Sequence, residues 1–210
     1  MRIVIPIYEG FTALDAVGPY EVLSRLPGAE IVWTALEAGP IHSEPGVLKL
    51  VADVATRDVD RCDVLVVPGG PSSRRAGKAG LADWVRAIHL TTQWTTSVCT
   101  GADILGMAGV LDGLSATTHW SATARLADYG ATYSEERVVV QGKVATAAGV
   151  SAGIDLGLQL ASLIAGDDVA KAIQLGIEYD PQPPFDSGSV AKAEPATVDR
   201  LRAVIAARSG

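Results

Sequence analysis

Segments with two different patterns of hydrophobic and polar positions alternate along most of the chain. Short apolar runs such as 2–7 and 62–67 hold too few polar residues for a half-exposed strand, so they predict strands buried on both faces of a sheet. Segments such as 81–90 space their apolar residues at helical intervals, which predicts helices packed by one face on that sheet. The alternation predicts a doubly wound, mostly parallel sheet in a three-layer α/β fold.

Turn and cap signals predict the remaining elements. We expect strands at 29–36, 47–51 and 115–119, a hairpin of 138–141 with 144–147, and helices at 14–26, 101–108, 121–129, 154–164, 168–178 and 195–207. Residues 72–80 are expected to form a solvated loop. Thr12 and Asp15 resemble a capping box, and Pro19 is expected to distort the first turn of its helix. No linker marks a second domain, so residues 1–210 are expected to form one domain, with 185–210 as a C-terminal extension and helix.

The stretch 95–102, Thr-Thr-Ser-Val-Cys-Thr-Gly-Ala, predicts a strand that turns sharply through Cys99 into a helix. Such an elbow holds a nucleophile clear of the sheet, and the first N–H groups of the helix point toward its target. The partial positive charge there favours a thiolate. Cys99 is therefore a candidate catalytic thiol; the alternative is a small core residue. Thr100 could lend its N–H to an oxyanion or its hydroxyl to the surroundings of the sulfur, or simply start the helix.

Two more candidate sites fall at the same edge of the predicted sheet. A buried strand runs into a Pro-Gly-Gly turn at the carboxyl edge, where open α/β folds bind ligands, and an exposed N–H at Gly69 or Gly70 is a candidate oxyanion donor. An ordinary glycine turn is the alternative. If the carboxyl of Asp15 reaches Cys99, the two acids should share one proton and supply a nucleophile with a general acid. Asp15 could instead only complement the helix dipole.

Three further residues are candidates for the pocket. His119 would form a Cys–His pair if it faced Cys99, although a lone histidine after a Thr-Thr strand is more often a packing residue. Trp120 and Val150 are expected at the same edge, with core packing as the alternative for each. Cys62 lies at the entry of a strand, opposite the ligand edge, and is interpreted as structural.

Composition limits the classes of function. The formal net charge of −7 argues against sequence-independent binding to nucleic acid or to an anionic membrane. No signal-peptide h-region is present and no apolar stretch reaches the roughly 18–20 residues of a membrane span, so a cytoplasmic protein is expected. The 2 cysteines and 3 histidines are dispersed, which predicts neither a disulfide nor a metal site. The glycines match neither the dinucleotide fingerprint nor the phosphate loop, so no cofactor is expected.

Five motifs stand in order along nearly the whole chain. They are Leu14–Pro19 (Leu-Asp-Ala-Val-Gly-Pro), Val67–Gly70 (Val-Pro-Gly-Gly), Ser97–Ala102 (Ser-Val-Cys-Thr-Gly-Ala), Ala116–Trp120 (Ala-Thr-Thr-His-Trp) and Gly149–Asp155 (Gly-Val-Ser-Ala-Gly-Ile-Asp). Together they resemble the DJ-1/PfpI superfamily. Within it the closest likeness is to the isocyanide hydratase branch, and the tail 178–185, Glu-Tyr-Asp-Pro-Gln-Pro-Pro-Phe, strengthens that likeness. The resemblance implies a flavodoxin-like fold, a homodimer, a nucleophile at Cys99 and an acidic partner at Asp15.

The same resemblance implies that water is added to an isocyanide, giving an N-substituted formamide through a thioimidate on Cys99. Much of the superfamily has glutamate in place of Asp15. The protease-like branch has histidine in place of Thr100, and for this reason peptidase activity is not expected. Three alternatives stay open. The first two are a glyoxalase- or deglycase-like enzyme on small carbonyl compounds, which would need an engaged His119, and a redox sensor whose Cys99 oxidises. A third is a regulatory ligand-binding module, for which a helix-turn-helix extension would be expected.

Overall fold

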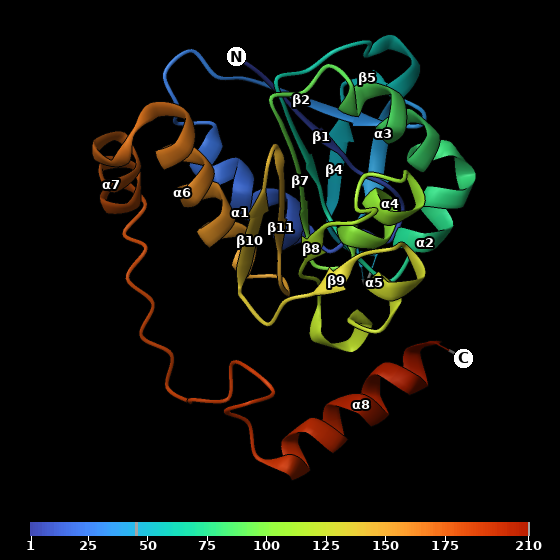
Figure 1. The fold of residues 1–210 in the computed structure, drawn as a ribbon, viewed down its shortest axis with the longest axis vertical. Coiled ribbons are helices and arrows are strands. Elements are labelled where there is room, and N and C mark those ends of the chain that lie inside the picture. Colours follow the sequence, from blue (N-terminus) through green and yellow to red (C-terminus); the bar gives the residue numbers. More distant parts are fainter. Residues whose placement is uncertain (45, 210) are drawn as a thin grey trace. The chain divides into compact units, whose positions relative to one another are not determined.

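A computed structural model describes residues 1–44 and 46–209 (Figure 1); residue 210, the last of the expected domain, lies outside this range. The described residues contain a seven-stranded sheet in the order β10-β11-β7-β6-β1-β2-β5. Its strands are β1 (Arg2–Pro6), β2 (Glu30–Ala35), β5 (Val54–Ala55), β6 (Val64–Val67), β7 (Trp94–Val98), β10 (Val138–Gln141) and β11 (Val144–Ala147). Neighbouring strands are parallel except β10 and β11, which form the expected hairpin.

The central strands are buried along their length. Every residue of β6 is buried, and β1 is buried from its second residue onward, as their unbroken apolar runs predict. Strand β7 is the exception in composition, because three of its buried residues carry hydroxyl groups. The hydroxyl of Thr96 donates to the carbonyl of Leu65 on β6 at 2.9 Å, so this side chain is satisfied inside the sheet.

Helices cover both faces of the sheet. Figure 1 shows α1 (Ala13–Leu23), α6 (Ala152–Ala165) and α7 (Asp167–Gly176) on one side, and α2 (Ser73–Ala76), α3 (Ala82–His89), α4 (Gly101–Met107) and α5 (Arg125–Asp128) on the other. The predicted three-layer, doubly wound α/β fold is therefore confirmed. Short helical turns at Thr56–Asp58, Gly77–Leu81 and Trp120–Ala122 join these elements.

Close packing of α1 against α6 depends on small residues. A Cβ added at Gly153 would lie 3.0 Å from Cδ of Pro19, and one added at Gly157 would lie 2.9 Å from Cβ of Val22. Glycine therefore lets the two backbones approach. This contact fixes α1, whose first turn carries Asp15, against α6, whose start follows Val150.

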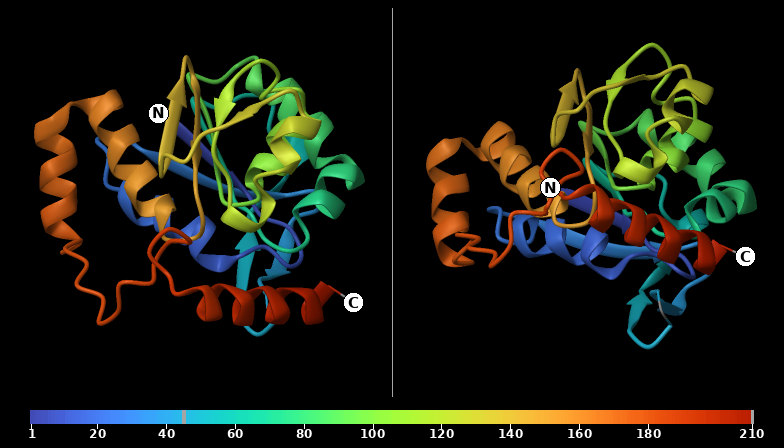
Figure 2. Two further views of the ribbon diagram at one scale, coloured as in Figure 1. Left: turned by 60° about the horizontal axis from the view of Figure 1, so that its bottom comes forward. Right: turned by 90° about the horizontal axis from the view of Figure 1, so that it is seen from below.

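Four segments differ from their predicted structure. The helix expected at 121–129 is reduced to the turn Trp120–Ala122 and to α5. Residues 72–80 are helical rather than a solvated loop, because Ala76 and Leu81 turn into the core. The strand expected at 47–51 is β4 (Lys49–Ala52), which pairs with β3 (Gly39–His42) in a separate hairpin that stands out from the body in Figure 2. The strand expected at 115–119 is shortened to β8 (Ser115–Ala116), paired with β9 (Thr132–Tyr133) outside the main sheet.

The chain divides into two compact units, Met1–Ile177 and Glu178–Gly210. The first contains the sheet and its covering helices. In the second, residues 179–185 are not helical, as the repeated prolines predict, and α8 (Pro195–Ser209) is the expected last helix. Among the described residues, no helix combines the length and the apolar character needed to cross a membrane.

Candidate active site

The predicted elbow is present at Cys99. Strand β7 ends at Val98, α4 begins at Gly101, and Cys99 between them has a φ of +58°, which is uncommon for a residue with a side chain. Its N–H donates to the carbonyls of Ala147 and Ala148 at 3.0 and 2.9 Å, which holds this conformation in place. Backbone strain of this kind persists where the surroundings fix it, and it gathers at functional sites.

Asp15 meets Cys99 from the first turn of α1. Its side chain is fully buried, and Oδ2 accepts the N–H of Gly69 at 2.9 Å. The other oxygen, Oδ1, is buried and receives no hydrogen bond from an N–H or O–H group in the described part of the chain. The carboxyl and the Cys99 thiol lie close enough for each to shift the pKa of the other. The two residues are thus brought together.

Burial dominates the electrostatics of this pair. It raises the pKa of Asp15 from 3.8 to about 7, against the opposing effect of the Gly69 N–H. Burial also raises the pKa of the Cys99 thiol, and the negative charge of Asp15 raises it further. Two adjacent anions are unfavourable in such a place, so above pH 7 the pair holds one proton between sulfur and carboxyl.

Two backbone N–H groups face the sulfur of Cys99. They belong to Thr100 and Val150, and both lower the pKa of the thiol against the effect of burial. Val150 has a φ of +35° in the turn before α6. The sequence suggested Val150 only as a lining side chain; its backbone contribution depends on a conformation that no residue pattern signals. These donors stabilise sulfur when it carries negative charge.

The glycine turn differs from its predicted role. The N–H of Gly69 is bound to Asp15, and the N–H of Gly70 donates to Oγ1 of Thr100 at 2.9 Å, so neither is the exposed oxyanion donor that we expected. The Thr100 hydroxyl also donates to the Gly70 carbonyl at 3.0 Å and is not directed at the sulfur. Through these hydrogen bonds the turn connects Asp15 with the start of α4.

His119 does not form the conditional Cys–His pair. Its Nδ1 accepts the N–H of Ser121 at 3.3 Å and lies 2.7 Å from the Ser121 hydroxyl. Burial and the nearby Arg125 lower the pKa of its ring, so the imidazole is neutral at physiological pH. The ring packs over Gly149, where an added Cβ would lie 2.7 Å from Cδ2, and it lies 5.5 Å from the Trp120 ring. His119 thus borders the turn that carries Val150, and Trp120 lies beside the His119 ring.

A buried ion pair behind the elbow was not predicted from the sequence. Asp103, on the first turn of α4, is 3 % exposed and accepts hydrogen bonds from Arg125 at 2.6 Å, Ser73 at 3.2 Å and Tyr129 at 3.3 Å. These partners come from α2, from α5 and from the residue after α5. The network ties the helix that follows Cys99 to its neighbours, and its members are too far apart in sequence to show as a motif.

Replacing Asp103 by alanine should lower the free energy of unfolding by roughly 3 kcal/mol, because it leaves the partly buried guanidinium of Arg125 without its partner. Urea titration of the two proteins measures the difference. Asp83→Ala is the matched control, since it breaks an exposed pair with Arg86 and should cost less than about 0.5 kcal/mol. Equal losses in the two variants would contradict a structural role for the Asp103 network.

Thr12 also differs from its predicted role. It is the N-cap residue of α1, but its hydroxyl does not cap the helix. Instead Oγ1 donates to Oε1 of Glu44 at 2.8 Å, and the N–H of Asp15 is bound by the Thr12 carbonyl at 3.1 Å. A tertiary contact has replaced the local capping box. This hydrogen bond holds the carboxylate of Glu44 at Thr12, which stands three residues before Asp15 in the chain.

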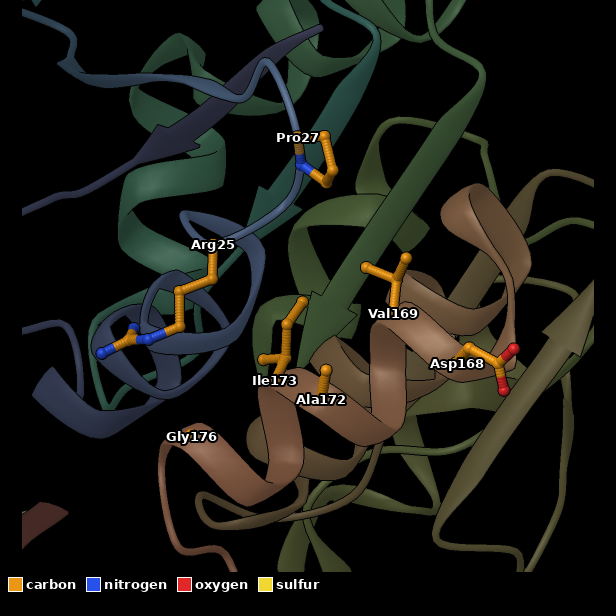
Figure 3. Close-up of a pocket in the computed structure, with 7 residues that line it drawn as sticks. All are labelled: Arg25, Pro27, Asp168, Val169, Ala172, Ile173 and Gly176. Carbon is orange, nitrogen blue, oxygen red and sulfur yellow. The ribbon is translucent and has the colours of Figure 1, made fainter.

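A cavity of about 450 Å³ lies away from this site (Figure 3). It is lined by Arg25, Pro27, Asp168, Val169, Ala172, Ile173 and Gly176. Helix α1 starts beside the carboxyl end of β1 and ends before Arg25, so the cavity is at the amino edge of the sheet. It contains none of the residues described above. Ligands of open α/β sheets bind at the carboxyl edge, where Cys99 and Asp15 lie.

Comparison with known proteins agrees with this geometry. The chain is 42% identical to an isonitrile hydratase of Pseudomonas putida over 90% of this chain and 83% of that protein. A crystal structure of a ThiJ/PfpI family protein from Pseudomonas syringae, 35% identical, covers 98% of this chain and 86% of that one with a TM-score of 0.94. Drosophila melanogaster DJ-1beta, at 21% identity, shares the fold with a TM-score of 0.76 over 84% of this chain and 97% of its own.

The match to a family model extends over most of the first compact unit. Residues 1–163 match the model of the DJ-1/PfpI family, a range that contains the elbow, the glycine turn and the Val150 turn. The fold, the order of the motifs and the 42% identical relative agree with that match. The chain therefore belongs to the DJ-1/PfpI family.

Proposed function

We propose that this chain is an isonitrile hydratase, which adds water to an isocyanide and releases an N-substituted formamide. The observation that carries the proposal is the buried Cys99–Asp15 pair at the elbow, in a chain 42% identical to a protein of that activity. The pair places a proton donor, the carboxyl of Asp15, next to a nucleophile, the sulfur of Cys99. A homodimer in the cytoplasm, which family membership supports, is part of the proposal.

The first step uses the proton that the pair shares. When Asp15 holds that proton, Cys99 is a thiolate stabilised by the N–H groups of Thr100 and Val150. The terminal carbon of an isocyanide is electrophilic, so sulfur adds to it and forms the S–C bond. The same carbon becomes basic as the bond forms, and the Asp15 proton passes to it. The product is a thioimidate on Cys99, with Asp15 left as a carboxylate.

Hydrolysis then restores the pair. Asp15, now ionised, accepts a proton from water as the water oxygen attacks the thioimidate carbon, and passes that proton to the imidate nitrogen. The hydroxyl proton of the tetrahedral adduct goes to Asp15 while the C–S bond breaks. The carbonyl of the formamide forms, sulfur leaves with the bonding electrons, and Cys99 and Asp15 return to their starting state. One carboxyl therefore acts in turn as acid, base, acid and base, and ends the cycle protonated as it began.

The surroundings of the pair favour this function over a glyoxalase-like one. A glyoxalase-like mechanism would need His119 to act on the substrate, but the ring of His119 is bound to Ser121 instead. The buried Oδ1 of Asp15 has no N–H or O–H partner in the described residues and is therefore available to exchange a proton with a substrate atom. Trp120 and Val150 are proposed to border the substituent of the isocyanide.

The direct test is to incubate an aryl isocyanide with the freshly reduced protein and follow it by ultraviolet absorbance. Conversion to the N-aryl formamide, identified by its mass, is the expected result. Methylglyoxal serves as the comparison substrate. Turnover of methylglyoxal without formamide formation would overturn the proposal in favour of carbonyl chemistry.

A further inference from the structure

A second carboxylate is fixed beside the active site by the loop between β3 and β4. Glu44 is half-buried, its N–H donates to the carbonyl of Phe11 at 2.9 Å, and its Oε1 accepts the Thr12 hydroxyl at 2.8 Å. Phe11 and Thr12 follow β1 and lead directly into the turn of α1 that carries Asp15. Glu44 is thus held by both backbone and side chain at the carboxyl edge of the sheet.

Within the described residues, no basic side chain neutralises the negative charge of Glu44. No ion pair with Glu44 is found among residues 1–44 and 46–209; its described side-chain partner is the neutral hydroxyl of Thr12. Glu44 raises the pKa of Asp15, of Tyr8 and of His119, which come from different elements around the site. Its field therefore extends across the space between α1 and the His119 segment.

Resting on the proposed function, we propose that Glu44 is a specificity-determining residue that disfavours substrates with a negative charge near the reacting carbon and favours neutral or cationic ones. The reason is Coulombic. A like charge brought close to a half-buried carboxylate is repelled strongly, because water screens the pair incompletely there. The thiolate that forms at Cys99 adds to that repulsion, so Glu44 and the nucleophile discriminate in the same direction.

Two matched pairs of reagents test this proposal. The first pair is 4-isocyanobenzoate and its methyl ester, which differ in one negative charge, and the readout is the ratio of their kcat/KM values. The second pair is iodoacetate and iodoacetamide, which alkylate a thiol with loss of iodide. The readout is the ratio of the rates at which Cys99 gains mass, resolved from Cys62 by peptide mapping. The second pair requires no enzymatic turnover.

Glu44→Gln is the informative variant because its amide oxygen can still accept the Thr12 hydroxyl while the charge is lost. We expect it to raise the anionic-to-neutral ratio about tenfold in both pairs. Glu30→Gln removes an exposed charge at the start of β2, the opposite edge of the sheet, and should leave the ratios unchanged. In the wild-type protein, about 0.5 M NaCl should raise the ratios partway, as expected for partly screened charges.

The outcomes separate the two proposals. An alkylation ratio that Glu44→Gln leaves unchanged would overturn the charge preference, whatever the hydratase assay gives. Equal loss of rate toward the anionic and neutral members would also overturn it, because that result marks Glu44 as structural support for Thr12. A shifted alkylation ratio without formamide from either isocyanide would retain the charge preference and reject the proposed hydratase.

Discussion

Replacing Cys99 by alanine should abolish detectable formamide formation, with kcat lowered by at least about 10⁴-fold. The reason is that the reaction proceeds through an S–C bond, and neither Asp15 nor a bound water can supply an equivalent nucleophile to the isocyanide carbon. The measurement is the initial rate of ultraviolet change with an aryl isocyanide, with the product identified by mass. In wild-type protein quenched during turnover, a mass increase equal to one isocyanide should appear on the peptide that contains Cys99.

Cys62 offers a matched control for this result. It is also buried, but it lies before β6 at the opposite edge of the sheet, and burial raises the pKa of its thiol to about 12. Cys62→Ala should therefore retain nearly full activity and carry the same adduct on Cys99. Near-ultraviolet circular dichroism checks that Cys99→Ala keeps its fold. Normal turnover in folded Cys99→Ala, or loss of turnover in Cys62→Ala, would contradict a thiol mechanism at Cys99.

Most of the fold could be predicted because its signals are local. A run such as 64–67 is apolar on both faces, which a sheet covered by helices on both sides requires, and the observed β6 is buried at every position. The elbow was predictable for the same reason. A β-type run, a cysteine and a small-residue helix stand next to each other in the chain, and the topology then brings Asp15 to the same edge.

What the sequence missed depends on partners that are distant along the chain. The N–H groups of Gly69 and Gly70 were expected to be exposed, but they are bound by side chains 54 and 30 residues away. The hydroxyl of Thr12 was expected to cap its own helix, yet it binds Glu44 on another element. In each case a local pattern identified a polar group correctly, while the tertiary structure decided which acceptor or donor it meets.

Asp15→Asn should lower kcat by roughly 10²–10⁴-fold while leaving substrate binding nearly intact. The amide can still accept the Gly69 N–H through its oxygen, so the site keeps its shape. It cannot deliver a proton to the isocyanide carbon or accept one from water, and both half-reactions slow. Steady-state kinetics with an aryl isocyanide separate the fall in kcat from any change in KM. A variant that loses binding but retains kcat would contradict this role.

The pH profile gives a sharper form of the same prediction. Below about pH 7 both members of the pair are protonated, so kcat/KM of the wild-type protein should rise with pH and level off above that value. Asp15→Asn has no carboxyl to titrate and should lose this step. A wild-type rate that stays flat between pH 5 and about 8 would contradict the shared proton.

The free energy of unfolding should also depend on the ionisation of Asp15. It should fall as the pH rises, whereas the activity should rise. The pKa of Asp15 is raised from 3.8 to about 7 in the folded protein, so the folded state binds the proton more tightly than the unfolded chain. Its contribution is complete below pH 3.8 and is lost as the pH rises through about 7. The difference in unfolding free energy between wild type and Asp15→Asn should therefore shift against wild type by about 4 kcal/mol across that window. Other titrating groups cancel in this comparison, so urea titrations of both proteins at several pH values isolate the buried acid. A difference that does not change with pH would mean that folding does not raise the pKa of Asp15, so the carboxyl could not hold the shared proton near neutral pH.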